Sequence, residues 1–276
     1  MIKVLTLMDD TGSENLALRA EHGLSYWVEA GGRRFLFDCG QGAATMANAR
    51  RLGADLASAD FTICSHSHYD HAAGFRDMAE AGCGGKLLYT GPGFWERKYA
   101  RDGLKYTDLS AGFDENFLAE RRVVHCVCGG LLEVAERCWL VGDFPRVHKF
   151  EKIPERFVKG EAPDCEPDDF SDEICLAMDT ERGLVVLVGC SHPGILNMAA
   201  KVHEALGRPI YALFGGTHLV EADGARIEQT VKELRAMGLS VLGLSHCSGR
   251  AAEEYLRACG GLEACHMATG DLVAVR

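Results

Sequence analysis

The sequence predicts an α/β (α+β) fold in which two β-sheets pack face to face and helices cover their outer faces. Three observations predict it. The chain starts with strand-like runs, strands and helices then alternate, and the same order returns in the second half. Such alternation is typical of sheets covered by helices. The sequence contains no short repeat, low-complexity segment or linker, so we expect one domain over residues 1–276.

Apolar and β-branched runs separated by short turns predict the strands of the first half. These runs occupy residues 2–8, 24–29, 34–38, 60–64 and 86–89. Glycines between the second and third runs allow a tight turn, so these two strands are expected to form an antiparallel hairpin. Ala-rich or amphipathic segments predict helices at residues 42–52 and 74–81.

Two stretches interrupt this pattern and are predicted to be irregular insertions. Residues 91–120 carry aromatic and charged side chains without a regular period, which favours an inserted loop or lid. Residues 142–172 are basic at first and acidic later. Strands are expected between them at residues 123–127, 131–135 and 138–141.

The second half returns to regular order. Strands are predicted at residues 173–179, 184–189, 210–214, 241–245 and 272–275. Helices are predicted at residues 195–206, 227–237 and 250–258.

The segment from His66 to His71 carries three imidazoles and one carboxylate in the order His-x-His-x-Asp-His, between a predicted strand and a predicted helix. These groups are ligands of zinc, iron and manganese. His66 and His68 alternate by two and project to one side of an extended chain, whereas Asp70 and His71 follow the bend. Burying so many polar groups without a shared partner would cost several kcal/mol. We therefore predict two adjacent metal ions, one held by His66 and His68 and the other by Asp70 and His71.

Three more histidines, His192, His218 and His246, each follow a predicted strand. We expect His192 to be a metal ligand, because His66 and His68 alone cannot complete a metal shell. His246 is expected to be a ligand and His218 a catalytic acid, although the sequence leaves open which of the two completes the shell. His203 and His266 lack this placement and are assigned to surface or core packing.

Carboxylates also occur near predicted strand ends. Asp38 ends an apolar strand, and we expect it to hydrogen-bond the outer nitrogen of a ligand histidine, which would fix the tautomer of that ring. Asp172 and Glu173 precede a strand. Either they supply a carboxylate to the metals, or they belong to a solvated acidic loop.

Composition excludes several classes of protein. The formal net charge of −11 argues against a nucleic-acid binder, which would need a basic face. No apolar run approaches the roughly 18–20 residues of a membrane helix, so we expect no membrane partner. The 12 cysteines form no Cys-x-x-Cys pair, and the first residues lack a secretion signal. We therefore expect reduced thiols and a cytoplasmic location. The oligomeric state does not follow from the sequence.

The metal pair is the expected source of catalysis, because the sequence has neither a Gly-x-Ser-x-Gly elbow nor a phosphate-binding Gly-x-x-x-x-Gly-Lys loop. Two divalent ions activate water and polarise a carbonyl or phosphoryl oxygen. We expect zinc, with iron or manganese as alternatives. Asp70 would ligate a metal and hold the nucleophilic water, and His218 or a residue of the irregular insertions would protonate a leaving group.

The motif from His66 to His71 resembles the signature of the metallo-β-lactamase superfamily, and the Asp38, His192 and His218 segments follow in the expected order. Four segments are similar to one branch, the hydrolases grouped with dihydropterin-ribofuranosylaminobenzene phosphate synthase. They are Glu21-His22-Gly23-Leu24-Ser25, Val188-Gly189-Cys190-Ser191-His192-Pro193-Gly194-Ile195, Gly215-Gly216-Thr217-His218-Leu219 and Ser245-His246-Cys247.

This resemblance implies a four-layer αββα sandwich, the metallo-β-lactamase fold, with metals at one sheet edge. It also implies ligands at His66, His68, Asp70, His71 and His192, with a further histidine later. Many superfamily members have a bridging Asp where this chain reads Gly189-Cys190-Ser191-His192. Either His192 substitutes for that Asp, or one metal site is weaker.

The resemblance further implies a small-molecule substrate that carries a pterin ring and a phosphate. Arg146 and Lys149, in the basic part of the second insertion, would suit the phosphate; a solvated loop is the alternative. The aromatic residues Phe94, Trp95 and Tyr99 would suit the flat ring, unless they anchor the first insertion.

Three other function classes compete with this metal-dependent hydrolase or related transferase. A di-iron redox protein would need an electron source, and the sequence shows no flavin or iron–sulfur motif. The acidic charge disfavours a nuclease. A non-catalytic metal-binding or ligand-binding protein would retain the site without turnover.

Overall fold

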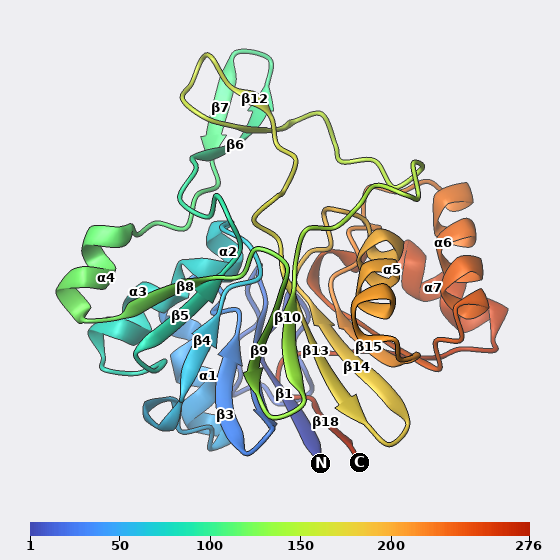
Figure 1. Cartoon of the computed structure of the whole chain (residues 1–276), viewed down its shortest axis with the longest axis horizontal. Coiled ribbons are helices and arrows are strands. Elements are labelled where there is room, and N and C mark those ends of the chain that lie inside the picture. Colours follow the sequence, from blue (N-terminus) through green and yellow to red (C-terminus); the bar gives the residue numbers. More distant parts are fainter.

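The computed structural model describes residues 1–276 and contains two seven-stranded sheets packed face to face (Figure 1). In sheet order, the first consists of β18 (Leu272–Val275), β1 (Ile2–Met8), β2 (Ser25–Ala30), β3 (Arg33–Phe37), β4 (Phe61–Ile63), β5 (Leu87–Thr90) and β8 (Val124–Val127). The first four of these pair antiparallel, and β3, β4, β5 and β8 pair parallel. The predicted hairpin of β2 and β3 is confirmed.

The second sheet repeats this plan. In order, it consists of β17 (Glu263–His266), β16 (Val241–Leu244), β15 (Ile210–Gly215), β14 (Gly183–Val188), β13 (Cys175–Thr180), β10 (Cys138–Val141) and β9 (Leu131–Ala135). Strands β14 to β17 pair parallel, and β9, β10, β13 and β14 pair antiparallel. Parallel strands end at the same edge of a sheet, so the loops that follow β14, β15 and β16 lie close together.

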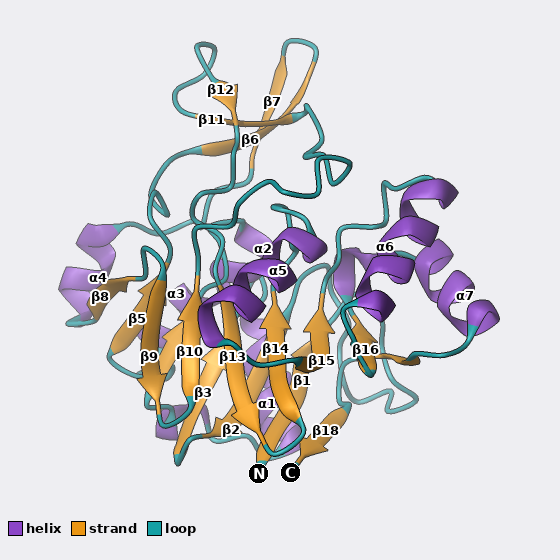
Figure 2. Cartoon of the chain, turned by 45° about the vertical axis from the view of Figure 1, so that its right-hand side comes forward, coloured by secondary structure: helices purple, strands orange, loops and turns teal.

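Helices cover the outer faces of both sheets (Figure 2). Those beside the first sheet are α1 (Ala43–Leu52), the one-turn α2 (Tyr69–Ala72), α3 (Gly74–Glu80) and α4 (Glu115–Arg121). Those beside the second sheet are α5 (Ile195–Leu206), α6 (Gly224–Ala236) and α7 (Arg250–Cys259). Two short 3-10 helices, η1 and η2, span Leu56–Ser58 and His246–Ser248.

The buried apolar side chains form layers that match this arrangement. A cluster of 22 buried residues lies between the sheets and includes Phe35, Phe37 and Phe214. Clusters of 20 and 18 buried residues pack between each sheet and its helices. The predicted αββα sandwich is confirmed.

The two predicted insertions are more regular than the sequence suggested. Together they form a third sheet in the order β12 (Glu166–Pro167), β11 (Phe157–Lys159), β6 (Lys98–Asp102) and β7 (Lys105–Asp108). This sheet projects from the end of the sandwich where α2 lies (Figure 1). Strands of two to five residues are too short to produce a recognisable period, which explains why the sequence predicted loops.

Two other observations concern the whole chain. No helix is both long enough and apolar enough to cross a membrane. All twelve cysteines are free thiols.

The prediction also missed three short elements. They are α2 and β17, which span four residues each, and α4, which spans seven residues at the end of the first insertion.

Candidate metal centre

The loop after β4 carries the histidine cluster, and two buried carboxylates hold its backbone. Ser65 N donates to Asp38 Oδ1 at 2.6 Å, and Ser67 N donates to Asp172 Oδ2 at 2.9 Å. Asp38 lies in the first half of the chain and Asp172 in the second. The loop is therefore fixed from both sides, and the side chains of His66 and His68 emerge into the space between the halves.

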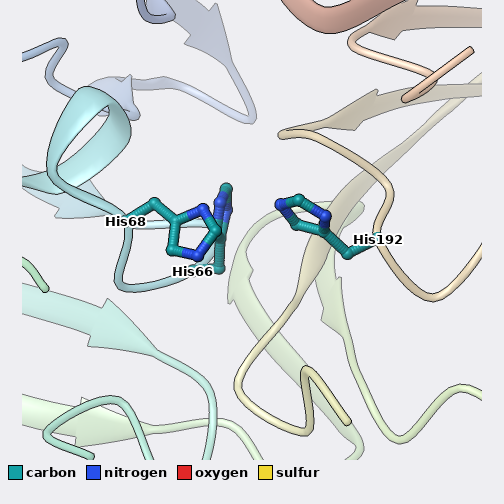
Figure 3. A group of neighbouring side chains, drawn as sticks. All are labelled: His66, His68 and His192. Atoms are coloured by element: carbon teal, nitrogen blue, oxygen red, sulfur yellow. The ribbon is translucent and has the colours of Figure 1, made fainter. Parts of the chain in front are cut away.

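His66, His68 and His192 form a first group whose ligand atoms all lie within 4.8 Å of one another. The rings of His66 and His68 come from the β4 loop and face the ring of His192, which comes from the loop after β14 (Figure 3). Their ring centroids are 4.7 to 5.1 Å apart. Burial lowers the pKa of all three imidazoles well below 6.5, so they are neutral at pH 7, as metal ligands must be.

The nitrogens of this group fit a metal ion. His66 Nε2, His68 Nε2 and both ring nitrogens of His192 are buried without a hydrogen-bond partner in the protein. Buried polar atoms are rarely left unpaired, because each lost hydrogen bond costs about 1–3 kcal/mol. A cation bound by these three side chains would account for His66 Nε2, His68 Nε2 and one of the two ring nitrogens of His192.

His192 is positioned by strained backbone and by Glu173. Ser191 has a φ of +60°, and the Glu173 carboxylate accepts hydrogen bonds from Ser191 N at 2.6 Å and His192 N at 2.9 Å. Phe170 stacks on the His192 ring with centroids 3.8 Å apart. Neither predicted role of Asp172 and Glu173 holds: both are buried and bind backbone amides, so they are neither placed as metal ligands nor part of a solvated loop.

Asp70, His71 and His246 form a second group. Asp70 Oδ2 lies 3.1 Å from His246 Nε2 and 3.6 Å from His71 Nε2. The opposite nitrogens of these rings contact carboxylates: His71 Nδ1 lies 2.7 Å from Asp38 Oδ2, and His246 Nδ1 lies 2.6 Å from Asp10 Oδ1. Each ring is thereby oriented with Nε2 directed at Asp70.

Cys190 lies at the junction of the two groups. Its Sγ is 3.1 Å from His71 Nε2, and it forms a further cluster with His66 and His71. From the sequence, either His192 replaces the bridging Asp of many superfamily members or one metal site is weaker, and no cysteine is given a role. The structure places the Cys190 thiol beside ligands of both groups. Cys190 lies two residues after the end of β14.

His218 lies beside the first group. Its ring centroid is 4.5 Å from that of His192 and 5.8 Å from that of Phe157. Burial lowers its pKa below 6.5. His246, rather than His218, is placed with Asp70 and His71, which separates the two residues that the sequence left undecided.

The residues predicted to bind substrate are dispersed. Arg146 donates to the carbonyl of Asp169 and lines a cavity of about 380 Å³ together with Phe170 and Glu173. Lys149 is exposed and its side chain makes no hydrogen bond or ion pair. Trp95 packs against Phe94 and Phe113 beside the apolar layer of the first sheet, the contact expected of a residue that anchors the insertion. Its stacking on a substrate ring stays a prediction.

Asp10 and His22 were missed as site residues. Asp10 contacts both His22 and His246, and the three form another potential metal-binding cluster. Asp10 and His22 lie in an irregular segment between β1 and β2. The segment containing His22 was noted for its family resemblance only, and no periodic signal places its side chain.

Comparisons with known proteins agree with this geometry. Residues 18–82 match the metallo-beta-lactamase superfamily. The chain is also 30% identical over 268 residues to 7,8-dihydropterin-6-methyl-4-(beta-D-ribofuranosyl)-aminobenzene-5'-phosphate synthase of Methanocaldococcus jannaschii, covering 91% of this chain and 89% of that protein. The chain belongs to the metallo-β-lactamase superfamily. Within the superfamily it falls in the branch of that synthase, as its motifs predicted.

Two solved structures share the fold of this chain. Tm1679, described as a metal-dependent hydrolase of the β-lactamase superfamily, is 27% identical and superposes with a TM-score of 0.85 over 100% of this chain and 99% of its own. Zinc-bound PqqB from Methylobacterium extorquens has a TM-score of 0.59 at 12% identity, covering 99% of this chain and 100% of that chain, and shows the shared fold alone.

Proposed function

We propose that this protein is a metal-dependent enzyme that uses two divalent ions, zinc by preference, on a small phosphorylated or pterin-like molecule. The observation that carries the proposal is the set of buried imidazole nitrogens without partners at His66, His68 and His192. These residues would hold one ion. Asp70, His71 and His246 would hold the other, and Cys190 lies between them.

Bound divalent ions would supply an activated water and polarise a carbonyl or phosphoryl oxygen. The chain itself supplies orientation and proton transfer. Asp38 and Asp10 fix the rings of His71 and His246 through their Nδ1 atoms. His218, neutral at pH 7 because burial lowers its pKa, can exchange a proton with a substrate that lies beside His192.

Two features support the substrate class. The cavity lined by Arg146 and Phe170 adjoins His192, because Phe170 stacks on that ring. A guanidinium at the rim of a cavity suits a phosphate. The archaeal relative is named for a product that joins a dihydropterin to a ribofuranosyl-aminobenzene 5'-phosphate. Transfer of this kind and hydrolysis are both compatible with the arrangement, so the assay has to separate them.

The test supplies metal-free protein with zinc, manganese or iron. One set of reactions contains phosphomonoesters and phosphodiesters, and another contains a pterin activated at its 6-methyl group together with a ribofuranosyl-aminobenzene 5'-phosphate. We expect turnover in at least one set. His68→Ala and Asp70→Ala should each lower the turnover rate at least about a hundredfold. Even residues that only hydrogen-bond a metal ligand contribute about 10–100-fold.

His203→Ala is the matched control, because His203 is an exposed histidine bonded only to the carbonyl of Arg208. It should keep the activity of the unmodified protein. Absence of turnover in both sets with every metal, or full activity of both site variants, would refute the proposed function.

A further inference from the structure

His22 is the one histidine near the centre that the function proposed above does not use. It belongs to the segment between β1 and β2, outside the His-x-His-x-Asp-His motif, and 55% of its side chain is exposed. Its Nε2 nevertheless lies 3.4 Å from Asp70 Oδ2.

Asp10 orients His22 and His246 in the same way. One carboxylate oxygen lies 2.9 Å from His22 Nδ1, and the other lies 2.6 Å from His246 Nδ1. The two rings are 4.7 Å apart. An ionised carboxylate only accepts hydrogen bonds, so both Nδ1 atoms carry a proton. Each Nε2 is thereby directed at the carboxylate of Asp70.

The His22 segment is also held firmly against Asp70. Gly23 N donates to Asp10 Oδ1 at 2.9 Å, and Leu24 N donates to the Asp70 carbonyl at 3.2 Å. A Cβ atom at Gly23 would lie 2.2 Å from that same carbonyl oxygen, so only glycine allows this approach. The position of His22 is therefore built into the fold, although its ring reaches solvent.

Three imidazole nitrogens lie around one carboxylate oxygen of Asp70. Its Oδ2 lies 3.1 Å from His246 Nε2, 3.4 Å from His22 Nε2 and 3.6 Å from His71 Nε2. Ligand atoms bound tetrahedrally at about 2.0–2.1 Å are roughly 3.3 Å apart.

We propose that His22 is a ligand of the second metal ion, where it joins Asp70, His71 and His246 in a shell of three imidazoles and one carboxylate. The inference rests on the proposed function to the extent that it assumes a second ion. Asp10 acts as a positioning residue that sets the tautomer of two ligands at once. Because His22 reaches solvent, it forms the outer wall of the second site.

The test is metal binding, measured apart from activity. Metal-free protein is titrated with Co(II) while the visible absorption is followed, and zinc content is measured after dialysis. We expect two ions per chain in the unmodified protein and in His203→Ala. In His22→Ala the second ion should bind at least about 10–100-fold more weakly, as expected for loss of a group that ligates or orients.

Chemical rescue separates ligation from a structural role. Since the His22 side chain is half exposed, added imidazole can reach the space left in His22→Ala and should restore the second Co(II) spectrum. His22→Gln serves if the alanine variant does not fold, and it should show the same loss. Unchanged affinity for both ions in a folded His22 variant would overturn the inference, as would a single ion in the unmodified protein.

Failure of this inference can be told apart from failure of the proposed function. If His22 variants bind two ions normally while His68→Ala abolishes turnover, only the proposed role of His22 is refuted. If no metal or substrate gives turnover, the proposed function falls whatever the result of the Co(II) titration.

Discussion

Asp38 Oδ2 lies 2.7 Å from His71 Nδ1, and both side chains are fully buried. The same carboxylate accepts hydrogen bonds from Ser65 N at 2.6 Å and Ser65 Oγ at 2.8 Å. Asp38 adopts a φ of +60° at the end of β3 to make these contacts, a conformation that non-glycine residues rarely adopt. One side chain thus fixes both the start of the histidine loop and the ring of a candidate metal ligand.

Asp38→Asn should weaken metal binding without removing any ligand. An asparagine amide can donate to His71 Nδ1, which favours the tautomer with its proton on Nε2, where the metal would bind. We expect affinity for the second ion to fall about 10–100-fold, measured by competition with a chromophoric chelator. Asp60→Asn, which removes a surface partner of Arg33, is the control. Equal affinities in the two variants would contradict the role of Asp38.

Lys98→Met should destabilise the fold through the third sheet. Lys98 Nζ is buried 3.1 Å from Asp168 and 2.5 Å from Asp172, so it joins β6 to the second insertion. Removing the Lys98 ammonium group leaves two buried carboxylates without a counter-ion, which costs about 3–5 kcal/mol of folding free energy. Urea unfolding of the metal-free protein measures the loss. Lys3→Met, which breaks a half-exposed pair with Glu29, should cost at most about 1 kcal/mol; losses of similar size would contradict this account.

Much of this architecture could be predicted because regular elements leave a periodic signal. Helix α5 and strands β1 and β18 have the predicted bounds. Residues that end a parallel strand are brought to one edge of the sheet, which is why His192 and His246 could be proposed as partners of the early histidines from their place after a strand alone.

The remainder depends on contacts that leave no local pattern. Pairing of β6 with β11 joins segments far apart in the sequence and involves only three residue pairs. Asp10 and His22 lie in an irregular segment whose path is set by tertiary contacts with Asp70. Cys190 follows the predicted strand 184–189 and leaves no periodic signal of its own, so only its position beside His71 reveals a ligand type.

Cys190→Ala should remove a metal–thiolate bond. In the metal-free protein burial and the neighbouring Cys247 raise the pKa of Cys190. At Cys247 the effect of burial is outweighed by the hydrogen bond from Cys190 and the charge of His246, and its pKa falls to about 5. We expect Cys190 to release its proton to solvent when a cation binds, because metals bind the thiolate.

Co(II) substitution distinguishes the two thiols, since a Co(II)–thiolate bond gives an intense near-ultraviolet charge-transfer band that imidazole and carboxylate do not. The band should be present in the unmodified protein and in Cys247→Ala, and absent in Cys190→Ala. A band that survives in Cys190→Ala and disappears in Cys247→Ala would assign the ligand to Cys247 instead.

His266 should make stability depend on pH. It was assigned to packing, yet its Nε2 lies 2.7 Å from Asp9 Oδ1 and its Nδ1 lies 2.7 Å from Glu253 Oε1. Burial opposes its charge, but the hydrogen bonds and charges of Asp9 and Glu253 outweigh this and raise its pKa from 6.5 to about 9. The stabilisation is therefore complete below about pH 6.5 and is lost as the pH rises through about 9.

The comparison variant is His266→Gln, which keeps a polar side chain but cannot take up the proton. Thermal unfolding of the metal-free proteins should place the Tm of the unmodified protein at least about 2–4 °C above that of the variant at pH 6, which corresponds to ~1 kcal/mol. The difference should shrink between pH 8 and pH 10. Because Asp9 Oδ2 also accepts a hydrogen bond from His246 N at 2.7 Å, the variant should in addition weaken binding of the second ion. A Tm difference that is constant across this range would mean that His266 contributes by packing rather than by its charge.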